Sequence, residues 1–268
     1  MSREGVHPEA LVHPSAVVEE GARVGAGTRV GAFAYVGPHV ELAEGVELRP
    51  HAYVVGRTRL GEGAMVFPFA VVGEVPQDLK YAGEPTRLTI GPRTIIREHA
   101  QVHIGTEGGG GLTEIGADCL IMGGVHVAHD CRIGNRVILV NNAGLAGHVQ
   151  VGDGAIVGGL AGVHQWVRIG QGAMVGGLAK VTRDVIPYGL VDGPGATLHG
   201  LNLVGLKRRG LSRDEIGAMR SAYDVLKDGE GSFADRAARL PSGESVLVDE
   251  LRAFVSAASD RHFLTPRE

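Results

Sequence analysis

The chain has 268 residues, of which 43 are glycine, 44% are hydrophobic and only 4% are aromatic, and its formal net charge is −4. The lack of a Gly-X-Y period excludes collagen, the many aliphatic residues exclude disorder, and the weak negative charge gives no reason to expect a nucleic-acid partner. The sequence shows no apolar signal segment and no run of about 18 apolar residues. We therefore expect a cytoplasmic protein without a membrane span.

A period of six residues runs through the first two thirds of the chain. Every sixth residue is aliphatic from Val12 to Val72 and again from Ile90 to Val102, and after a slip of one residue the series continues from Ile115 to Val181. The residue two places earlier is small, and both cysteines, Cys119 and Cys131, belong to that second column. Glycine often follows the aliphatic residue and supplies a bend. This pattern is typical of a parallel β-helix built from hexapeptide repeats, which we expect over residues 1–190.

Two segments interrupt the period, near residues 73–87 and 103–114, and both are polar and rich in glycine or proline. We expect them to be loops extruded from the β-helix, since loops on regular scaffolds often carry function. After Pro187 the period stops. Ser212 and Glu215 form a capping box ahead of helically spaced apolar residues. The sequence therefore predicts a small C-terminal α-helical domain over residues 191–268.

Histidines gather along one corner of the predicted β-helix. Because three hexads close one coil, residues 18 apart stack, at a rise of about 4.8 Å per coil. One column contains His129, Gly147 and Gln165, and three further histidines lie within three positions of it: His126, His148 and His164. Asp130 follows His129 directly. A histidine with a neighbouring carboxylate suits a general base, and we prefer this interpretation to a metal site.

A second column contains almost no side chains. Gly123, Asn141, Gly159 and Gly177 are also 18 residues apart. The simplest explanation of such glycines is that they are turn residues. A bare stripe along the axis would also leave a channel for an extended apolar chain.

Five segments resemble the acyl-[acyl-carrier-protein]:UDP-N-acetylglucosamine O-acyltransferases. They are QDLKYAGEPT (77–86), HVAHDC (126–131), NNAGLAGHV (141–149), GVHQWVRIG (162–170) and GLKRRG (205–210). The resemblance implies a left-handed β-helix and a homotrimer with sites between subunits. It also implies transfer of a (R)-3-hydroxyacyl chain from the phosphopantetheine of acyl carrier protein, without another cofactor. The acceptor would be the 3-hydroxyl of UDP-N-acetylglucosamine, in the first step of lipid A biosynthesis.

The resemblance also implies roles for individual residues. His129 resembles the general base, Asp130 the residue that supports it, and Gly147 the residue whose backbone N–H stabilises the oxyanion. Gly159 and Gly177 would line the acyl-chain groove. The expected substrate contacts are Gln77, Asp78, Lys80, His126, His148, His164, Gln165, Asn202, Arg208 and Arg209. A basic cluster that includes Arg213 and Arg220 is expected to help dock the acidic carrier protein.

Two alternatives remain open at this point. The first is an N-acyltransferase of a related UDP-sugar, with either a 3-amino acceptor or the later N-acylation step of lipid A synthesis. The second is a protein like the γ-class carbonic anhydrases, in which histidines bind zinc. A metal assay and a transfer assay would separate these alternatives.

Overall fold

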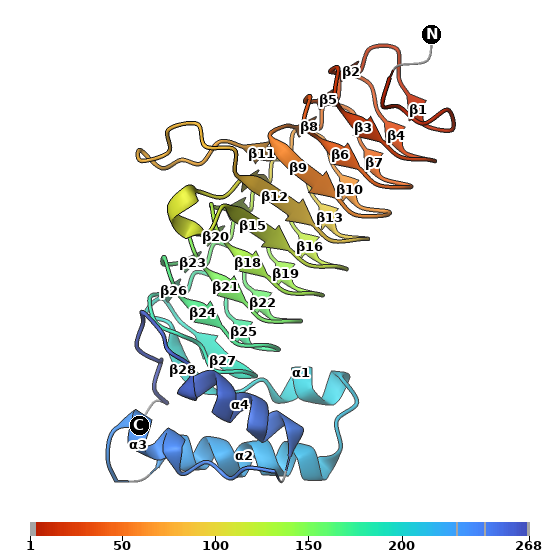
Figure 1. The fold of residues 1–268 in the computed structure, drawn as a ribbon. Coiled ribbons are helices and arrows are strands. Elements are labelled where there is room, and N and C mark those ends of the chain that lie inside the picture. Colours follow the sequence, from red (N-terminus) through yellow and green to blue (C-terminus); the bar gives the residue numbers. More distant parts are fainter. Residues whose placement is uncertain (1–3, 229, 244, 267–268) are drawn as a thin grey trace.

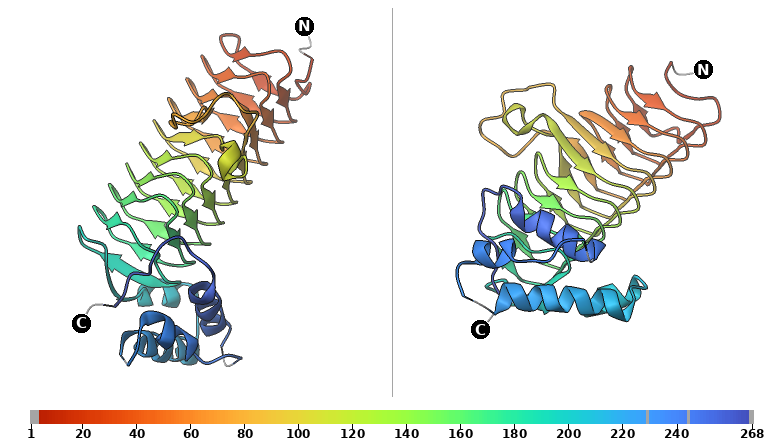
Figure 2. Two further views of the ribbon diagram at one scale, coloured as in Figure 1. Left: turned by 60° about the vertical axis from the view of Figure 1, so that its left-hand side comes forward. Right: turned by 60° about the horizontal axis from the view of Figure 1, so that its bottom comes forward.

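The computed structural model describes residues 4–228, 230–243 and 245–266. Short strands stack into a three-sided prism, and helices cover its C-terminal end (Figures 1 and 2). Neighbouring strands within each side are parallel, apart from one antiparallel pair at the C-terminal end. The chain is therefore a parallel β-helix followed by helices.

Each side of the prism is one sheet, and the chain visits the three sheets in turn. Sheet 1 has 11 strands: β1 (Leu11–Val12), β4 (Arg29–Val30), β7 (Glu47–Leu48), β10 (Met65–Val66), β13 (Ile95–Ile96), β16 (Leu120–Ile121), β19 (Ile138–Leu139), β22 (Ile156–Val157), β25 (Met174–Val175), β27 (Gly189–Asp192) and β28 (Thr197–Leu201). Sheet 2 has nine: β2 (Val17–Val18), β5 (Tyr35–Val36), β8 (Tyr53–Val54), β11 (Val71–Glu74), β14 (Gln101–His103), β17 (His126–Val127), β20 (Gly144–Leu145), β23 (Gly162–Val163) and β26 (Lys180–Val181). Sheet 3 has eight: β3 (Arg23–Val24), β6 (Glu41–Leu42), β9 (Arg57–Leu60), β12 (Arg87–Ile90), β15 (Leu112–Ile115), β18 (Arg132–Ile133), β21 (Gln150–Val151) and β24 (Arg168–Ile169).

The second residue of each short strand points into the prism and the first points out, as the alternation of a strand requires. The inward column of Ile121, Leu139 and Val157 is fully buried. Small residues fill the corners between these aliphatic layers, and Cys119 and Cys131 are two of them, both buried. Such an interior has little room for rings, which accounts for the low aromatic content.

The register is the one expected from the repeat. Ile138 pairs with Ile156, and Gly144 pairs with Gly162, so residues 18 apart stack. Pairing passes over the two interruptions, as where Val71 pairs with Gln101. The strands extend further into these interruptions than we expected, because Leu112–Ile115 and His103 continue the ladders of sheets 3 and 2. The segments outside the strands are thus 75–86 and 104–111, and Glu107–Gly109 in the second forms a single 3₁₀ turn, η1.

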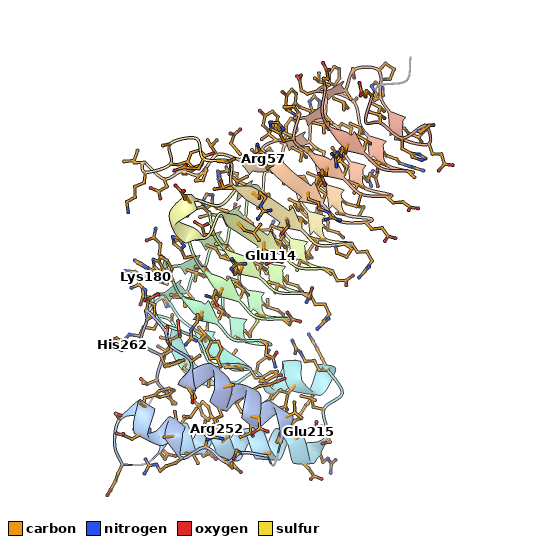
Figure 3. The ribbon with its side chains drawn as sticks, in the orientation of Figure 1. Arg57, Glu114, Lys180, Glu215, Arg252 and His262 are labelled. Atoms are coloured by element: carbon orange, nitrogen blue, oxygen red, sulfur yellow. The ribbon has the colours of Figure 1, made fainter. Side chains whose placement is uncertain are left out.

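The outer surfaces of the sheets differ in chemistry. Side chains such as Glu114 on sheet 3 and Lys180 on sheet 2 project away from the prism (Figure 3). Sheet 1 instead presents a half-buried apolar strip, which consists of Met65, Ile95, Leu120, Ile138, Ile156, Met174 and Leu190. A long, flat apolar strip of this kind marks a surface suited to association.

The sheet continues beyond residue 190, where we expected the helical domain to begin. Strand β27 adds to sheet 1, and β28 folds back on it in an antiparallel pair. This hairpin and the helices after it cover the end of sheet 1, which would otherwise expose unpaired strand edges.

Four helices follow in the described part of the chain. They are α1 (Leu203–Arg208), α2 (Arg213–Lys227), α3 (Phe233–Ala238) and α4 (Val246–Ser256). The predicted capping box of Ser212 and Glu215 begins α2. A second capping box, formed by Ser232 and Asp235, begins the short α3 that the apolar spacing did not reveal. Among the described residues, no helix is long and apolar enough to cross a membrane.

Candidate active site

The candidate site lies at the corner between sheets 2 and 3, which we call the 2–3 corner. The chain turns there between β17 and β18, and the same turn recurs one coil later. Asp130, His148 and Trp166 occupy equivalent positions in successive turns, with left-handed φ angles of 60°, 64° and 67°. A backbone bond from the His148 N–H to the His129 carbonyl, 3.1 Å long, joins the first two coils. The stacking therefore places these side chains one above another.

His129 and Asp130 form a buried pair at this corner. Nδ1 of His129 lies 2.8 Å from Oδ2 of Asp130, and the two residues are only 6% and 5% exposed. Because a carboxylate can only accept, the hydrogen of the neutral imidazole is on Nδ1. Nε2 then carries the lone pair. This is the arrangement of a general base with an orienting carboxylate.

The segment 104–111 also holds the Asp130 carboxylate in place. The Thr106 N–H donates to Oδ1 of Asp130 over 2.9 Å, and the Thr106 hydroxyl donates to Oδ2 over 2.6 Å. The Asp130 N–H donates to the Thr113 hydroxyl. Our sequence reasoning missed Thr106, because it lies in a segment without the six-residue period.

The segment 75–86 brings a second carboxylate to His129. Oδ2 of Asp78 lies 3.9 Å from Nε2 of His129. A turn holds the loop in shape, since the Lys80 N–H donates to the Asp78 carboxylate and the Tyr81 hydroxyl donates to the Glu84 carbonyl. The two extruded segments meet where the Thr86 hydroxyl donates to the Gly105 carbonyl. Asp78 thus lies near the base, with Lys80 and Gln77 on the same loop, and their roles as substrate contacts stay predictions.

His148 is the second imidazole of the corner. The rings of His148 and His129 are nearly perpendicular, with centroids 5.0 Å apart and an angle of 87° between the ring planes. The His148 ring also stacks on the ring of Trp166, with a centroid distance of 3.7 Å. Burial lowers the pKa of His148, partly offset by the nearby Asp130 carboxylate. Trp166 was also missed, although the 18-residue spacing from His148 would have found it.

His126 and His103 form a neighbouring pair beneath the segment 75–86. Their ring centroids are 5.1 Å apart, and Nδ1 of His103 lies 2.8 Å from the Val75 carbonyl. Burial lowers the pKa of His126, and the charges of His103 and His129 lower it further. His126 is therefore held neutral beside the candidate base.

Gly147 lies directly against the imidazole of His129. A Cβ atom at this position would be 2.5 Å from Cε1 and 2.7 Å from Nε2 of His129. Among the described residues, none accepts a hydrogen bond from the Gly147 N–H. The position can therefore bring a free backbone donor next to the base only because it has no side chain.

Other predicted residues lie further away within one chain. His164 and Gln165 are exposed, and both contact Arg261. Gly159 and Gly177 lie at the corner between sheets 1 and 2, across sheet 2 from His129.

The remaining predicted contacts lie at the corner between sheets 3 and 1. Asn202 caps helix α1 and donates to the Gly172 carbonyl, and the Arg209 guanidinium donates to the Gly154 carbonyl. Arg208 is the last residue of α1. The structure of a single chain does not bring these three residues to the 2–3 corner.

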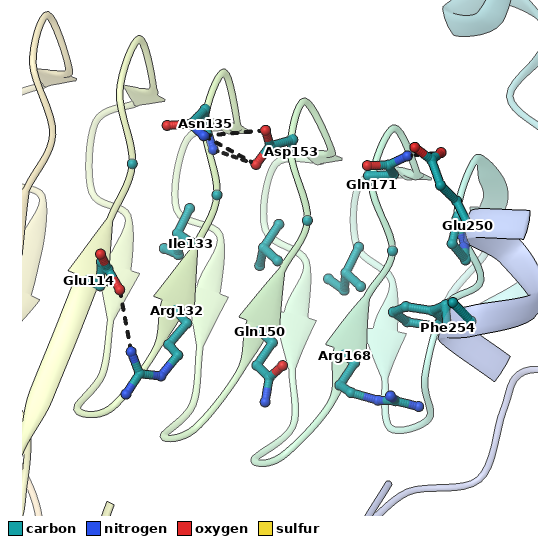
Figure 4. A pocket seen from close by; sticks show the side chains of 18 residues that line it. Glu114, Arg132, Ile133, Asn135, Gln150, Asp153, Arg168, Gln171, Glu250 and Phe254 are labelled. Atoms are coloured by element: carbon teal, nitrogen blue, oxygen red, sulfur yellow. Dashed lines mark hydrogen bonds and ion pairs between the residues drawn. The ribbon is translucent and has the colours of Figure 1, made fainter. Parts of the chain in front are cut away.

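A cavity of about 670 Å³ opens on the outer face of sheet 3, beside α4 (Figure 4). Arg132, Gln150 and Arg168 line one side, and Glu250 and Phe254 close its end. None of the predicted site residues lines it. His129, Asp130 and His148 bring two imidazoles and a carboxylate within 4.8 Å of one another, but the Asp130 oxygens already accept hydrogen bonds from His129 and Thr106.

Comparison with known proteins gives consistent matches over the chain. A family model described as UDP-N-acetylglucosamine O-acyltransferase, domain 2, matches residues 184–264, and a model of bacterial transferase hexapeptide repeats matches residues 112–147. A Paracoccus denitrificans protein named acyl-[acyl-carrier-protein]–UDP-N-acetylglucosamine O-acyltransferase is 57% identical over 75% of this chain and 77% of its own length. A Caulobacter vibrioides protein of the same name is 54% identical over 85% of this chain and 87% of its own.

Solved structures agree with the sequence matches. The UDP-N-acetylglucosamine acyltransferase from Campylobacter jejuni aligns with a TM-score of 0.90 at 38% identity, over 96% of this chain and all of its own. The corresponding enzyme from Arabidopsis aligns with a TM-score of 0.77 at 34% identity. These matches confirm the prediction of a left-handed parallel β-helix followed by helices.

Proposed function

The chain belongs to the acyl-[acyl-carrier-protein]–UDP-N-acetylglucosamine O-acyltransferases, and from this membership we propose how its own residues perform that reaction. It transfers a (R)-3-hydroxyacyl chain from acyl carrier protein to the 3-hydroxyl of UDP-N-acetylglucosamine, the first step of lipid A biosynthesis. The names of the curated relatives support this reaction and neither of the two alternatives. The observation that carries the mechanism is the buried His129–Asp130 pair.

His129 acts as the general base. Its Nδ1–H is held by Asp130, so the Nε2 lone pair removes the proton from the sugar 3-hydroxyl. The sugar oxygen attacks the thioester carbonyl, and the Gly147 N–H stabilises the oxyanion that forms. When the tetrahedral intermediate collapses, the phosphopantetheine thiolate leaves and takes the proton from the imidazolium of His129. No covalent enzyme intermediate is needed.

The loop residues orient the acceptor sugar. Asp78 lies 3.9 Å from Nε2 of His129, which makes its carboxylate a suitable acceptor for a sugar hydroxyl next to the reacting one. Lys80 and Gln77 supply further polar groups from the same loop. His126 and His148 have lowered pKa values because they are buried, and as neutral rings they can accept as well as donate hydrogen bonds to the sugar.

The complete site forms between subunits of a homotrimer. Asn202, Arg208 and Arg209 lie at a different corner from His129 within one chain, so a neighbouring subunit must bring them to the nucleotide. The apolar strip on sheet 1 supports this assembly, because a half-buried apolar strip of that length on the outside of the prism favours further burial against a second copy. His164 and Gln165, exposed in one chain, would then contact the same sugar nucleotide.

The acyl chain extends from the reaction centre along the glycine column of a neighbouring subunit, because within one chain this column lies across sheet 2 from His129. Gly159 and Gly177 stack on one another, with the Gly159 carbonyl 3.1 Å from where a Cβ of residue 177 would lie. A side chain at position 177 would shorten the groove. The carrier protein docks on the basic residues of α1 and α2, including Arg213 and Arg220, which are exposed.

Substitution of the base tests this proposal. We expect His129→Ala to lower kcat for transfer from 3-hydroxyacyl carrier protein to UDP-N-acetylglucosamine by about 10²–10⁴-fold. His39→Ala, at an exposed histidine of the N-terminal coils, serves as the matched control. Near wild-type transfer by a normally folded His129→Ala protein would rule out the mechanism. Stoichiometric zinc together with failure to bind the UDP-sugar would favour the anhydrase-like alternative instead.

A further inference from the structure

The segment 104–111 is built around Thr106. The carbonyl of Thr106 accepts hydrogen bonds from the N–H groups of Gly109 and Gly111, at 3.1 and 2.8 Å. Gly105 is tied to the ladder of sheet 3 by a bond from its N–H to the Arg87 carbonyl. Thr106 is thus fixed by backbone bonds on both sides, although it lies outside the regular coils.

The two donors of Thr106 are directed at the carboxylate of Asp130, whose side chain is fully shielded from solvent. The N–H of Thr106 donates to Oδ1, and its hydroxyl donates to Oδ2. Oδ2 also accepts the Nδ1–H of His129. One carboxylate oxygen is therefore shared between the threonine hydroxyl and the histidine, and bonds of this kind to an ionised group are stronger than neutral ones.

The backbone of the segment packs on the same carboxylate. A Cβ at Gly109 would overlap Cγ of Asp130, and a Cβ at Gly105 would lie 2.8 Å from its Oδ1. Solvent is therefore kept away from Asp130 by glycine backbone. The carboxylate has few donors available to it, so each of them has a large effect on its orientation and charge.

We propose that Thr106 is a positioning residue for acyl transfer, which acts through Asp130 to set the orientation and basicity of His129. The proposal rests on the role of His129 given above. Without the hydroxyl donor, Oδ2 concentrates its charge on the Nδ1–H of His129, and the imidazolium becomes easier to form. The carboxylate then favours a positive charge on the ring more strongly, and the ring is less firmly held.

Other charged groups also face this pair, and they remain unchanged in the variants below. Asp78 lies 3.9 Å from Nε2 of His129, and Nδ1 of His148 lies 3.8 Å from Oδ2 of Asp130. The charge of Lys80 acts on the ring of His148, and His126 interacts with the charge of His129. A change in the pH profile of kcat in these variants can therefore be assigned to the Thr106 side chain, because the other charged groups around the pair are the same.

Thr106→Val and Thr106→Ser in the full chain test the proposal. Valine keeps the shape and the backbone N–H but removes the hydroxyl, whereas serine keeps it. For Thr106→Val we expect kcat to fall about tenfold, since one charge-assisted hydrogen bond is lost, with KM for UDP-N-acetylglucosamine within about twofold of wild type. The acidic limb of the pH profile of kcat should move to higher pH. Thr106→Ser should restore both the rate and the profile.

A matched threonine separates this effect from a general loss of packing. Thr28 is fully buried in the N-terminal coils, and its hydroxyl donates to the Ala43 carbonyl. Thr28→Val should lower the melting temperature without moving the pH profile. Wild-type kcat and pH profile in a folded Thr106→Val protein would overturn the proposal.

A double-mutant cycle keeps the test informative if Thr106→Val folds poorly. When Asp130 is already Asn, adding Thr106→Ser or Thr106→Val should change kcat by less than about twofold, because the shared carboxylate is gone. Independent, multiplicative losses would contradict an action through Asp130. Retained transfer by His129→Ala would instead show that the proposed function itself is wrong, so the two failures are distinguishable.

Discussion

Gly147→Ala should disable the base without removing any polar group. The added Cβ would lie 2.5 Å from Cε1 and 2.7 Å from Nε2 of His129, whereas carbon atoms pack at about 3.5–4.0 Å. Gly147 is not among the residues with a left-handed φ angle, so alanine fits the backbone there. The strain must therefore be relieved by a movement of the imidazole of about 1 Å.

A displacement of that size is expected to be costly for catalysis. Misplacement of a reacting group by about 1 Å lowers the rate by about 10²-fold, and we expect kcat of Gly147→Ala to fall by that factor. The movement would also strain the 2.8 Å bond to Asp130, and overpacking of this kind costs about 1–3 kcal/mol of stability. Alanine retains the backbone N–H, so loss of the oxyanion donor would not explain the lower rate.

The assay is steady-state transfer from 3-hydroxyacyl carrier protein, together with a thermal melt of each variant. Gly217→Ala is the control, because Gly217 is an exposed residue of α2 and a Cβ there meets no atom within 4 Å. That control should be as active as wild type and slightly more stable, since alanine favours a helix over glycine. A Gly147→Ala protein with wild-type kcat would refute the close packing of Gly147 on His129.

Three further outcomes follow from the same geometry. Gly177→Met should shift the preferred donor to shorter 3-hydroxyacyl chains in a competition assay with a ladder of donors, and an unchanged preference would place the chain elsewhere. Reversing the charge of both Arg213 and Arg220 should raise KM for the acidic carrier protein and leave KM for UDP-N-acetylglucosamine unchanged, as initial-rate measurements can show. Burial lowers the pKa of His148 below 6.5 in the folded chain, so its contribution to stability is complete above pH 6.5 and is lost as the pH falls. The melting temperature of wild type should therefore drop more steeply below pH 6.5 than that of His148→Asn, and parallel curves would contradict the buried, neutral ring.

The regular coils were predictable because their geometry is periodic. Once residues 18 apart stack, His148 must lie near His129, and Gly147 must lie in the coil next to it. The same arithmetic applied to His148 would have identified Trp166 as its stacking partner. Periodicity thus determines contacts between coils without any knowledge of function.

Periodicity predicts the extruded segments only as interruptions, and Asp78 and Lys80 were predicted there from the family resemblance alone. Nothing in their composition says which residue returns to the site, and the contact of Thr106 with Asp130 depends on a loop conformation fixed by its own backbone bonds. Asn202 and Arg209 show a different difficulty. Their placement at another corner follows from the path of β28 and α1, which have no six-residue period.

The stacked coils have a consequence for how such a chain can change in length during evolution. Tandem duplication of 18 residues in the N-terminal coils preserves every strand register and leaves the 2–3 corner untouched. Insertion of one further coil of unrelated sequence between Asp130 and Gly147 would instead move the oxyanion donor about 4.8 Å away from the base. Natural length variation in this family should therefore be tolerated at the N-terminal end and selected against between these two residues.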